Sequence, residues 1–540
     1  MTSDSEPRRG LSFLSAWRRP DSLAWIYLLA ALALFAALAA YYRSKHGTPV
    51  VDDAYIAFSY ARNLAQGAGL SYVGHLRVEG YTDFLWVLIV AAAMKLGLRP
   101  DLTGQALSGA SGAALIACVW FLSQRHSMTP VVLRLAAPLL ATLGPVAFWA
   151  TSGLETLTFA LLVLVGATLS CDSSGHPSSR RLVLAGFVFF MAALAHPDAV
   201  VWFASSLVFV TIVNRHGRLR QAAVFGASFG LPFAIYWLWR WSYFGDFFPN
   251  TFYAKSDHSL AAIMRGLKYV AGVGSVVGPI SMGLVAAAIP LGLLDRPRNR
   301  LFFVLALTWL AYVACVGGDT LPMRRFLVPA LPLVVLLLEE SLGLLLRGLD
   351  HNRAVRAMAL VVAACVAGSV GASLVDPGVG VVRGDGVLDA SRVEVGKWLA
   401  ASAAPNDVIA VEAAGAIPFF ANLATIDMLG LNDRHIAHYG QSDAGAPAGH
   451  QRYDPRYVLS KRPAFVFMNS IVEEGQPVGP ETRALPSISS LLDEKIFRMT
   501  YTRARLNSLV VHELVYIRND RFADLMSRGL VSRPGSEGGD

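Results

Sequence analysis

The feature that most constrains this chain is an uninterrupted apolar run near its start. Residues 23–42, LAWIYLLAALALFAALAAYY, hold twenty residues without a charge, and as a helix this run is about 30 Å long, enough to cross a bilayer. Basic residues precede it, but the run is too long for a secretory signal and no small-residue cleavage site is convincing. It predicts an uncleaved anchor whose preceding segment, residues 1–22, is cytoplasmic.

Composition extends this interpretation to the whole chain. With 54% hydrophobic and 16% charged residues among 540, the sequence is that of a polytopic membrane protein. The net charge of +8 is explained by basic cytoplasmic loops, so a nucleic acid partner is not predicted. The four cysteines lie in or beside apolar runs without CxxC or zinc spacing, and they predict neither a disulfide framework nor a metal site.

The distribution of charge predicts how the chain threads the membrane. Basic loops at 178–181, 214–220, 295–300 and 347–356 belong to the cytoplasm, and the loops between them to the opposite face. The apolar segment 84–98 has only fifteen residues and is predicted to be interfacial or re-entrant. We therefore expect eleven spans within a transmembrane module of residues 23–375, with an outer loop at 43–83.

The C-terminal region has a different pattern. Residues 407–429 indicate a strand, a short helix and a strand, and PAFVFM and LVVHELVYI indicate further strands. Residues 376–530 are thus predicted to form an extracytoplasmic α/β domain that could bind glycan, followed by a disordered tail at 531–540. The predicted fold class is an α-helical polytopic membrane protein with a C-terminal α/β domain.

Two adjacent carboxylates, Asp52 and Asp53, stand where the chain leaves the first predicted span. The residues after them, 52–66, place aromatic side chains one turn apart with Arg62 a turn further, which predicts a short helix along the membrane surface. One aspartate can cap that helix. The second is unexplained by capping, and an ionisable group at a membrane boundary is a functional candidate. Neighbouring charge and an apolar environment raise a carboxyl pKa, so the pair predicts a general base.

The other outer loops supply further candidates. Lys255, Arg324 and Arg325 are predicted to hold a phosphate, because the arginine fork suits that ligand. The alternative for these arginines is interfacial anchoring of the next helix, and for any one loop carboxylate simple solvation. The candidate substrate-binding residues are Arg62, Glu79, Tyr81, Glu155, His196, Asp198, Asp246, Asn250 and Asp319.

An outward-facing site with acids and phosphate-binding bases fits the transfer of a sugar from a lipid phosphate. Outside the cytoplasm there is no nucleotide-sugar pool, so the donor must cross the bilayer on a polyprenyl tail, and its phosphate is the leaving group. Positioning and electrostatics dominate such a reaction. No cofactor is required and a divalent cation is not indicated; P-loop, HExxH and dinucleotide-binding motifs are absent from the sequence.

Six motifs resemble those of the bacterial GT-C superfamily of glycosyltransferases, in particular the group of the mycobacterial terminal β-(1→2)-arabinofuranosyltransferase. In chain order they are DDAYIAFSYARNLAQGAGLSYVGHLRVEGYTDFLW, SGLET, HPDAV, YFGDFFPNTFYAK, GGDTLPMRRFLVPALP and IDMLGLND. The resemblance implies an inverting transferase that uses a polyprenyl-phosphate sugar such as decaprenylphosphoryl arabinofuranose. It assigns the acidic pair to Asp52 and Asp53, Glu-Gly-Tyr-Thr to residues 79–82, and Gly-Asp with its following arginine to Asp319 and Arg325.

The chain departs from that group at three positions. Ser59 and His196 stand where the group often has arginine, and Asp83 where it often has asparagine. A neutral His196 would contact a phosphate more weakly than arginine does. These departures bear on the sugar and the acceptor more than on the type of reaction.

The sequence therefore predicts a glycosyltransferase in the bacterial inner (plasma) membrane, with its active site and C-terminal domain on the periplasmic side. Its expected partners are a polyprenyl-phosphate sugar donor, membrane lipid and a glycan acceptor, which could be arabinan, another envelope polysaccharide or a glycoprotein. The alternatives are a transporter or flippase for lipid-linked sugars or small molecules, and a non-catalytic glycan-assembly subunit. A transporter would show polar groups near mid-membrane and repeated halves.

Overall fold

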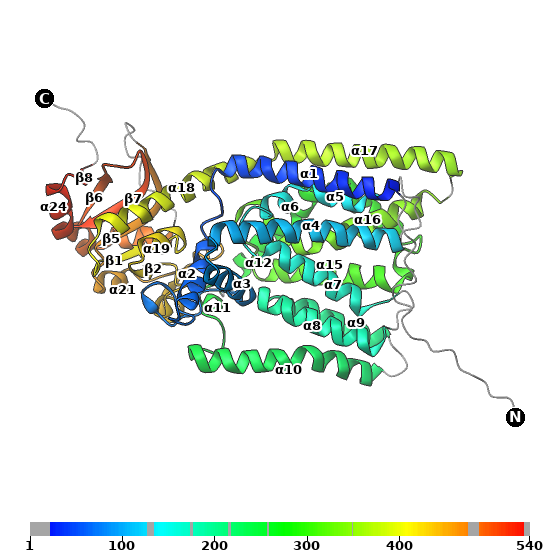
Figure 1. Ribbon diagram of the computed structural model, residues 1–540, viewed down its shortest axis with the longest axis horizontal. Helices are drawn as coiled ribbons and strands as arrows, with labels where there is room; N and C mark the ends of the chain where they lie inside the picture. Colours follow the sequence, from blue (N-terminus) through cyan, green and yellow to red (C-terminus); the bar gives the residue numbers. More distant parts are fainter. Residues whose placement is uncertain are drawn as a thin grey trace.

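The computed structural model describes residues 22–126, 134–172, 177–213, 218–255, 259–347, 349–473 and 485–533. The predicted cytoplasmic segment up to residue 21 and residues 534–540 of the predicted tail lie outside the described residues. Within these ranges the chain forms a long helical bundle that carries a small domain with a β-sheet at one end (Figure 1).

The first half of the chain is helical. Its elements are α1 (Ser22–His46), α2 (Ala54–Ala65), η1 (Val73–His75), α3 (Phe84–Lys95), α4 (Pro100–His126), α5 (Ala136–Thr142), α6 (Gly144–Trp149), α7 (Thr156–Ser170), α8 (Ser179–Ala195), α9 (Ala199–Val213), α10 (Arg218–Phe244) and α11 (Asn250–Lys255). The helix α2 is the one predicted at residues 52–66, so the aromatic spacing identified it correctly.

The second half of the bundle leads into the C-terminal domain. Its elements are α12 (Leu260–Ala271), α13 (Val273–Val277), α14 (Pro279–Ala288), η3 (Leu293–Asp295), α15 (Pro297–Cys315), η4 (Pro322–Ala330), α16 (Leu331–Leu345), α17 (His351–Val375) and α18 (Gly378–Ser402). Capping side chains fix several helix starts: Ser259 accepts from the Ala262 N–H, and Asp350 accepts from the Arg353 N–H.

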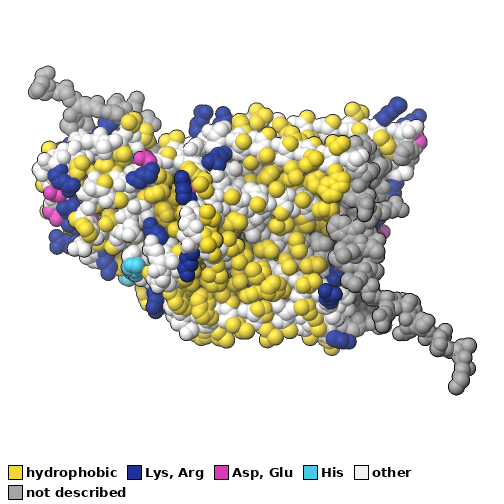
Figure 2. All heavy atoms as spheres, viewed as in Figure 1, with side chains coloured by type: hydrophobic (Ala, Val, Ile, Leu, Met, Phe, Trp, Pro, Cys, Tyr) yellow, Lys and Arg dark blue, Asp and Glu magenta, His cyan; other side chains and the backbone are white. Residues whose placement is uncertain are grey.

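Seven of the described helical segments are long and apolar enough to cross a membrane. They are Ala24–His46, Pro100–Gln124, Arg218–Phe244, Leu260–Val277, Pro297–Cys315, Pro322–Leu345 and Asn352–Val375. Shorter apolar helices of 10–17 residues include α3, which lies in the segment predicted to be interfacial or re-entrant. Length and composition thus identify seven spans among the described helices and leave the shorter apolar helices unassigned, so the eleven spans expected from the sequence stay a prediction. Figure 2 shows hydrophobic side chains over most of the bundle on the face in view, as a lipid-facing surface requires.

The C-terminal domain is built on a six-stranded mixed sheet in the order β2-β1-β5-β7-β6-β8. Its strands are β1 (Val408–Val411), β2 (Ala424–Asp427), β5 (Phe465–Glu473), β6 (Tyr501–Leu506), β7 (Val511–Arg518) and β8 (Val531–Ser532). β1 pairs in parallel with β2 and β5, whereas β7 pairs antiparallel with β5 and β6. The helix α19 (Ala416–Ala421) joins β1 to β2. The predicted strand, short helix and strand are therefore confirmed.

Smaller elements complete this domain. They are α20 (Arg434–Tyr439), the paired strands β3 (Gln441–Ser442) and β4 (Arg452–Tyr453), α21 (Pro455–Ser460), α22 (Pro486–Asp493), α23 (Lys495–Thr500) and α24 (Asn519–Ser527). Asp433 and Asp454 cap α20 and α21 by accepting backbone N–H bonds. The helix α20 packs against α11, which places this part of the domain beside the loop that follows α10.

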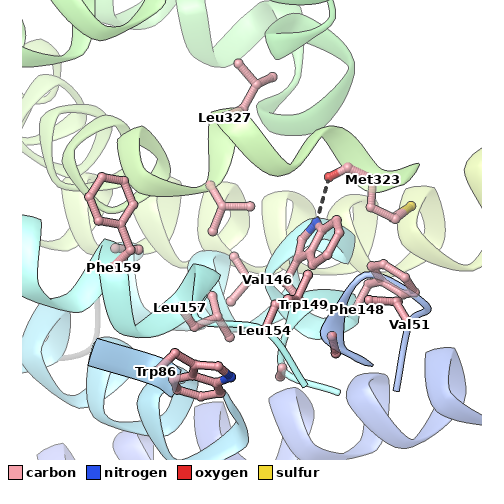
Figure 3. Close-up of a cluster of buried hydrophobic side chains, with 14 of the residues drawn as sticks. Val51, Trp86, Val146, Phe148, Trp149, Leu154, Leu157, Phe159, Met323 and Leu327 are labelled. Carbon is pink, nitrogen blue, oxygen red and sulfur yellow. Dashed lines mark hydrogen bonds between the residues drawn. The ribbon is translucent and has the colours of Figure 1, made fainter. Parts of the chain in front are cut away.

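A cluster of buried aromatic and aliphatic side chains lies among α3, α6, α7 and η4 (Figure 3). Two tryptophans in it satisfy their indole N–H groups with main-chain oxygens. Trp86 donates to Gly153 O at 2.9 Å, and Trp149 donates to Met323 O at 3.4 Å (Figure 3). The second bond ties η4 to α6, and η4 carries the two arginines of the predicted phosphate site.

Candidate active site

Two consecutive residues of η4 have a left-handed backbone. Met323 has φ 54° and Arg324 has φ 47°, although neither is glycine. Such conformations are unfavourable and persist where the surrounding structure holds them, often at functional sites. Here the Trp149 indole holds the Met323 carbonyl, and the turn directs the side chains of Arg324 and Arg325 into two different cavities.

The larger cavity has a volume of about 410 Å³ and a basic lining. Arg324 lines it together with Arg265 and Lys268 from α12, and Asp319 and Thr320 from the loop before η4. The C-terminal domain closes one side, because Pro447 and Ala448 also line the cavity. Three cations around a space of this size suit an anionic headgroup.

Arg325 connects the larger cavity to a group of carboxylates. Its Nε donates to Asp319 Oδ2 at 2.9 Å, and its guanidinium lies over the Trp149 ring, 5.8 Å from the centroid. Asp53 and Glu155 lie close enough to act on this guanidinium electrostatically. Arg325 is therefore held by a paired carboxylate on one side and faces two further carboxylates.

A second, much smaller cavity of about 20 Å³ adjoins Arg325. Glu155, His196 and Trp309 line it. His196 Nδ1 lies 3.4 Å from Asp198 Oδ2, and Tyr312 donates to Asp198 Oδ1 at 2.8 Å. The His-Pro-Asp turn between α8 and α9 thus reaches the same region as Arg325.

Asp83 is a buried acid that belongs to this group. Burial raises the pKa of Asp83 well above its ordinary value, and the Glu155 carboxylate raises it further, while Arg325 opposes the shift. These causes favour the neutral form of the Asp83 side chain. An asparagine is common at this position in the resembled group, and a neutral aspartic acid has the same shape and a comparable ability to donate a hydrogen bond.

The structure separates the roles of the adjacent aspartates. Asp52 is buried, and its Oδ1 accepts from the Ala416 N–H at 2.8 Å, the first backbone donor of α19. Asp53 is only partly buried, and its carboxylate makes no hydrogen bond or ion pair within the described ranges, not even as a cap of α2. Asp52 therefore anchors the C-terminal domain, whereas Asp53 leaves its carboxylate available.

The pKa of Asp52 is nonetheless far above its ordinary value. Burial raises the pKa of Asp52 to about 7; Asp389 and Asp53 raise it as well, and Arg392 and the bond from Ala416 lower it. The raised pKa is thus explained by the interface with the C-terminal domain and does not by itself identify Asp52 as the base.

Lys255, at the end of α11, is exposed and does not line the larger cavity, but it lies against the C-terminal domain. Its Cε lies 3.6 Å from the position that a Cβ on Gly449 would occupy. Burial lowers the pKa of His450, Lys255 lowers it further, and Asp53 raises it. His450 consequently lies near both Lys255 and Asp53, next to the segment that closes the larger cavity.

Other predicted residues lie outside this group and hold the outer loops together. Glu79 is buried and accepts from Arg240 Nε at 2.8 Å and 3.1 Å, with a further bond from Arg240 Nη2. Burial raises the pKa of Glu79, and the Arg240 guanidinium opposes this shift. Asn250 donates to Gly430 O at 2.7 Å and to Leu431 O at 2.9 Å. These residues bind protein groups.

The remaining three predicted residues also contact protein. Arg62 donates to Phe419 O at 2.6 Å and to Asn422 Oδ1 at 3.1 Å, so its guanidinium joins α2 to the C-terminal domain. Asp246 accepts from Arg434 at 2.8 Å. Tyr81 is buried among aromatic rings, and its hydroxyl has no hydrogen-bond partner among the described residues.

The site residues predicted from the sequence do not include Arg265, Lys268 or His450. The first two are three residues apart in a segment, Leu260–Val277, that is otherwise apolar enough to span a membrane, and charge in such a segment is a signal of function. His450 carries no comparable signal, because its place depends on the fold of the C-terminal domain. Among the described residues, no group of three or more His, Cys, Asp or Glu side chains could hold a metal ion.

Comparisons with known proteins place the fold. ArnT from Cupriavidus metallidurans in the apo state superposes with a TM-score of 0.52 at 13% identity, covering 91% of this chain and 97% of that one. The same protein bound to undecaprenyl phosphate gives 0.50 at 15% identity, covering 75% and 86%. The chain has a GT-C type fold. It is a multi-pass membrane protein.

Sequence comparisons add little to this. A domain of unknown function (DUF8728) matches residues 385–509, which include most of the C-terminal sheet. No curated protein matches the sequence. The GT-C fold confirms the predicted fold class, while the arabinofuranosyltransferase group rests on the motifs alone.

Proposed function

We propose that the chain is an inverting membrane glycosyltransferase that transfers a sugar, arabinofuranose, from a polyprenyl-phosphate donor to a glycan acceptor. The observation that carries this proposal is a cavity lined by three cations and Asp319, at the end of the bundle that carries the C-terminal domain. Asp319 pairs with Arg325, and Arg325 lies within electrostatic reach of Asp53, whose carboxylate has no hydrogen bond or ion pair among the described residues. Residues 23–375 form the catalytic module and residues 376–530 the domain that holds the acceptor.

The larger cavity is the proposed site of the donor phosphate. Arg265, Lys268 and Arg324 surround it, and its volume of about 410 Å³ admits a phosphate with part of a sugar. The fold supports a lipid donor, because ArnT, with which this chain shares it, has been crystallised with undecaprenyl phosphate. The polyprenyl tail of the donor would lie in the lipid along the exposed apolar side chains of α12.

Asp53 is the proposed general base. Its carboxylate removes the proton from an acceptor hydroxyl as that oxygen forms a bond to the anomeric carbon, and the bond from this carbon to the phosphate oxygen breaks with its electron pair on the phosphate. The anomeric configuration inverts in a single displacement. Positive charge from Arg324, together with Arg265 and Lys268, stabilises the departing phosphate.

The proposed orientation puts this site on the extracytoplasmic face of the bacterial plasma membrane. Figure 1 shows α1 running from the far end of the bundle to the C-terminal domain, so a cytoplasmic N-terminus implies an extracytoplasmic domain. Arg296, between η3 and α15, and Arg298, in the first turn of α15, pair with Glu340 of α16. The acceptor would then be arabinan, another envelope polysaccharide or a glycoprotein.

Transfer in reconstituted membranes tests this function. The purified chain in nanodiscs is supplied with radiolabelled decaprenylphosphoryl arabinofuranose and an arabinan oligosaccharide, and product is separated from lipid. Label in the oligosaccharide with the wild type, lost with Asp53→Asn and retained with Asp101→Asn, is the expected result. Asp101 is a suitable control because this carboxylate pairs with the exposed Arg99 at the start of α4.

Two outcomes would overturn the proposal. Transfer that survives in Asp53→Asn removes the base assignment. Movement of intact lipid-linked sugar between leaflets, without label in any of a panel of envelope glycans, would replace the transferase with a flippase.

A further inference from the structure

A buried polar network joins the C-terminal domain to the chain directly before Asp53. Its centre is Asp389 on α18, whose Oδ2 accepts from the Asp52 backbone N–H at 3.1 Å and lies 3.2 Å from His46 Nε2. Asp389 Oδ1 pairs with Arg392 Nη1 at 3.1 Å, one helical turn along α18. One carboxylate thus accepts a hydrogen bond from the Asp52 N–H and lies close to His46, the last residue of α1.

Arg392 carries this network to the centre of the sheet. Its Nε lies 3.1 Å from Glu513 Oε2 on β7, and its Nη2 donates to Asn469 Oδ1 on β5 at 2.9 Å. Glu513 and Arg392 are both buried. Because β5 and β7 are the two middle strands of the six-stranded sheet, the Asp52 main chain is connected to the centre of that sheet.

Close main-chain contacts also hold the segment from His46 to Asp52 against the C-terminal domain. A Cβ on Gly386 of α18 would lie 1.7 Å from His46 O, and a Cβ on Gly415 would lie 2.0 Å from Asp52 O. Neither position admits a larger residue without displacing main chain. The segment from His46 to Asp52 is therefore held by direct contact as well as by hydrogen bonds.

The position of Asp53 follows from these contacts. Asp52 is fixed by its N–H on Asp389 and by its carboxylate on the Ala416 N–H, so the peptide that leads to Asp53 has little freedom. The Asp53 carboxylate itself has no hydrogen bond or ion pair within the described ranges that could orient it. Any shift of the Asp52 peptide would move that carboxylate with it.

We propose that Asp389 and Arg392 are positioning residues, through which the C-terminal domain sets the geometry of Asp53. The inference rests on the proposed function, because it assumes that Asp53 takes the acceptor proton. It makes the domain part of the catalytic apparatus in addition to its proposed role in holding the acceptor. A misplacement of about 1 Å in such a group can cost about 100-fold in rate.

Hydrogen exchange and kinetics on the full-length chain in nanodiscs test the inference. In Asp389→Ala, we expect the Asp52 amide and residues 47–55 to exchange at least tenfold faster than in the wild type. We expect kcat to fall about 10- to 100-fold with the donor KM within twofold. Asp389→Asn keeps an acceptor oxygen for the Asp52 N–H, so it should retain much of the protection against exchange and of kcat. If the alanine variant does not fold, the asparagine variant is compared with the wild type in its place.

The control is Arg521→Gln, which breaks the pair with buried Asp407 inside the C-terminal domain but does not touch Asp52. It should leave exchange at 47–55 and kcat unchanged. Unchanged exchange in Asp389→Ala, a kcat within twofold of wild type, or an equal loss of protection in Arg521→Gln would overturn the inference. If the wild type transfers no sugar, the proposed function fails, and exchange at the Asp52 amide alone decides whether the network fixes this segment.

Discussion

Replacing Asp53 by asparagine removes a charge without removing a structural contact. The carboxylate makes no hydrogen bond or ion pair within the described residues, and the amide has nearly the same shape. We therefore expect the free energy of unfolding of Asp53→Asn to stay within about 0.5 kcal/mol of the wild type. The inter-domain bond from the Ala416 N–H to Asp52 is unaffected by this change.

The effect on catalysis should be large. General-base catalysis contributes about 10²- to 10⁴-fold to a rate, which corresponds to about 2.7–5.4 kcal/mol of transition-state stabilisation. The donor KM should change by less than about threefold, because the phosphate is held by cations in the larger cavity and Asp53 is not among the residues that line it. Loss of kcat with retained donor binding is the signature of a base.

The assay is transfer of labelled sugar in nanodiscs at saturating acceptor, with donor concentration varied, alongside thermal melting of each variant. Asp101→Asn, prepared in the same way, reports any general effect of losing an outer-face carboxylate. A kcat within threefold of the wild type for Asp53→Asn would show that Asp53 is not the general base. A rise in donor KM with unchanged kcat would instead place Asp53 in donor binding.

Other variants probe the neighbouring groups. Asp83→Asn should keep at least a third of the wild-type kcat in the same transfer assay, since burial and nearby carboxylates already favour the neutral acid. Arg324→Gln should raise the donor KM about tenfold, measured by titrating donor, because one cation of the phosphate cavity is lost. Glu79→Gln should destabilise the protein by about 3–5 kcal/mol in chemical unfolding, since it leaves the buried Arg240 guanidinium without its counter-charge. The pKa of Asp52 is about 7 in the folded state, above its value in the unfolded chain. At a pH between these two pKa values the folded state binds more protons than the unfolded state, so the free energy of unfolding falls as pH rises. An asparagine does not titrate, so the Tm of Asp52→Asn relative to wild type should increase from pH 5 to pH 8.

Local features of the fold could be predicted from the sequence. The helix after the acidic pair, α2, follows from aromatic spacing, and the strands β1, β2, β5 and β7 follow from short apolar runs bounded by turns. The number of spans was harder to predict. Apolar helices such as α9, with 15 residues, are too short for a standard crossing, so the sequence does not determine how they lie.

The roles of individual side chains depend on distant partners. Asp52 and Asp53 are equivalent in sequence, and only Asp389 and Ala416, more than 330 positions away, make the first an anchor. Glu79 belongs to the outer loop motif, yet Arg240, 161 positions further along, pairs with it. Pairings of this kind are set by tertiary packing and have no local pattern.

The cavity illustrates the same limit. Arg324 was predicted as a phosphate ligand from its type and its place on the outer face. Pro447 and Ala448 are small, uncharged residues, and nothing in their sequence context indicates that they close the cavity. Their contribution arises because the C-terminal domain docks on the bundle.

The proposed catalytic geometry is tested most directly by a structure of the chain with a non-transferable phosphonate analogue of the donor. We expect the phosphonate to lie in the larger cavity, bound by Arg324 with Arg265 or Lys268, and the anomeric carbon to face the Asp53 carboxylate with room for one hydroxyl between them. An analogue bound at the opposite end of the bundle, or with its anomeric carbon turned away from Asp53, would contradict it.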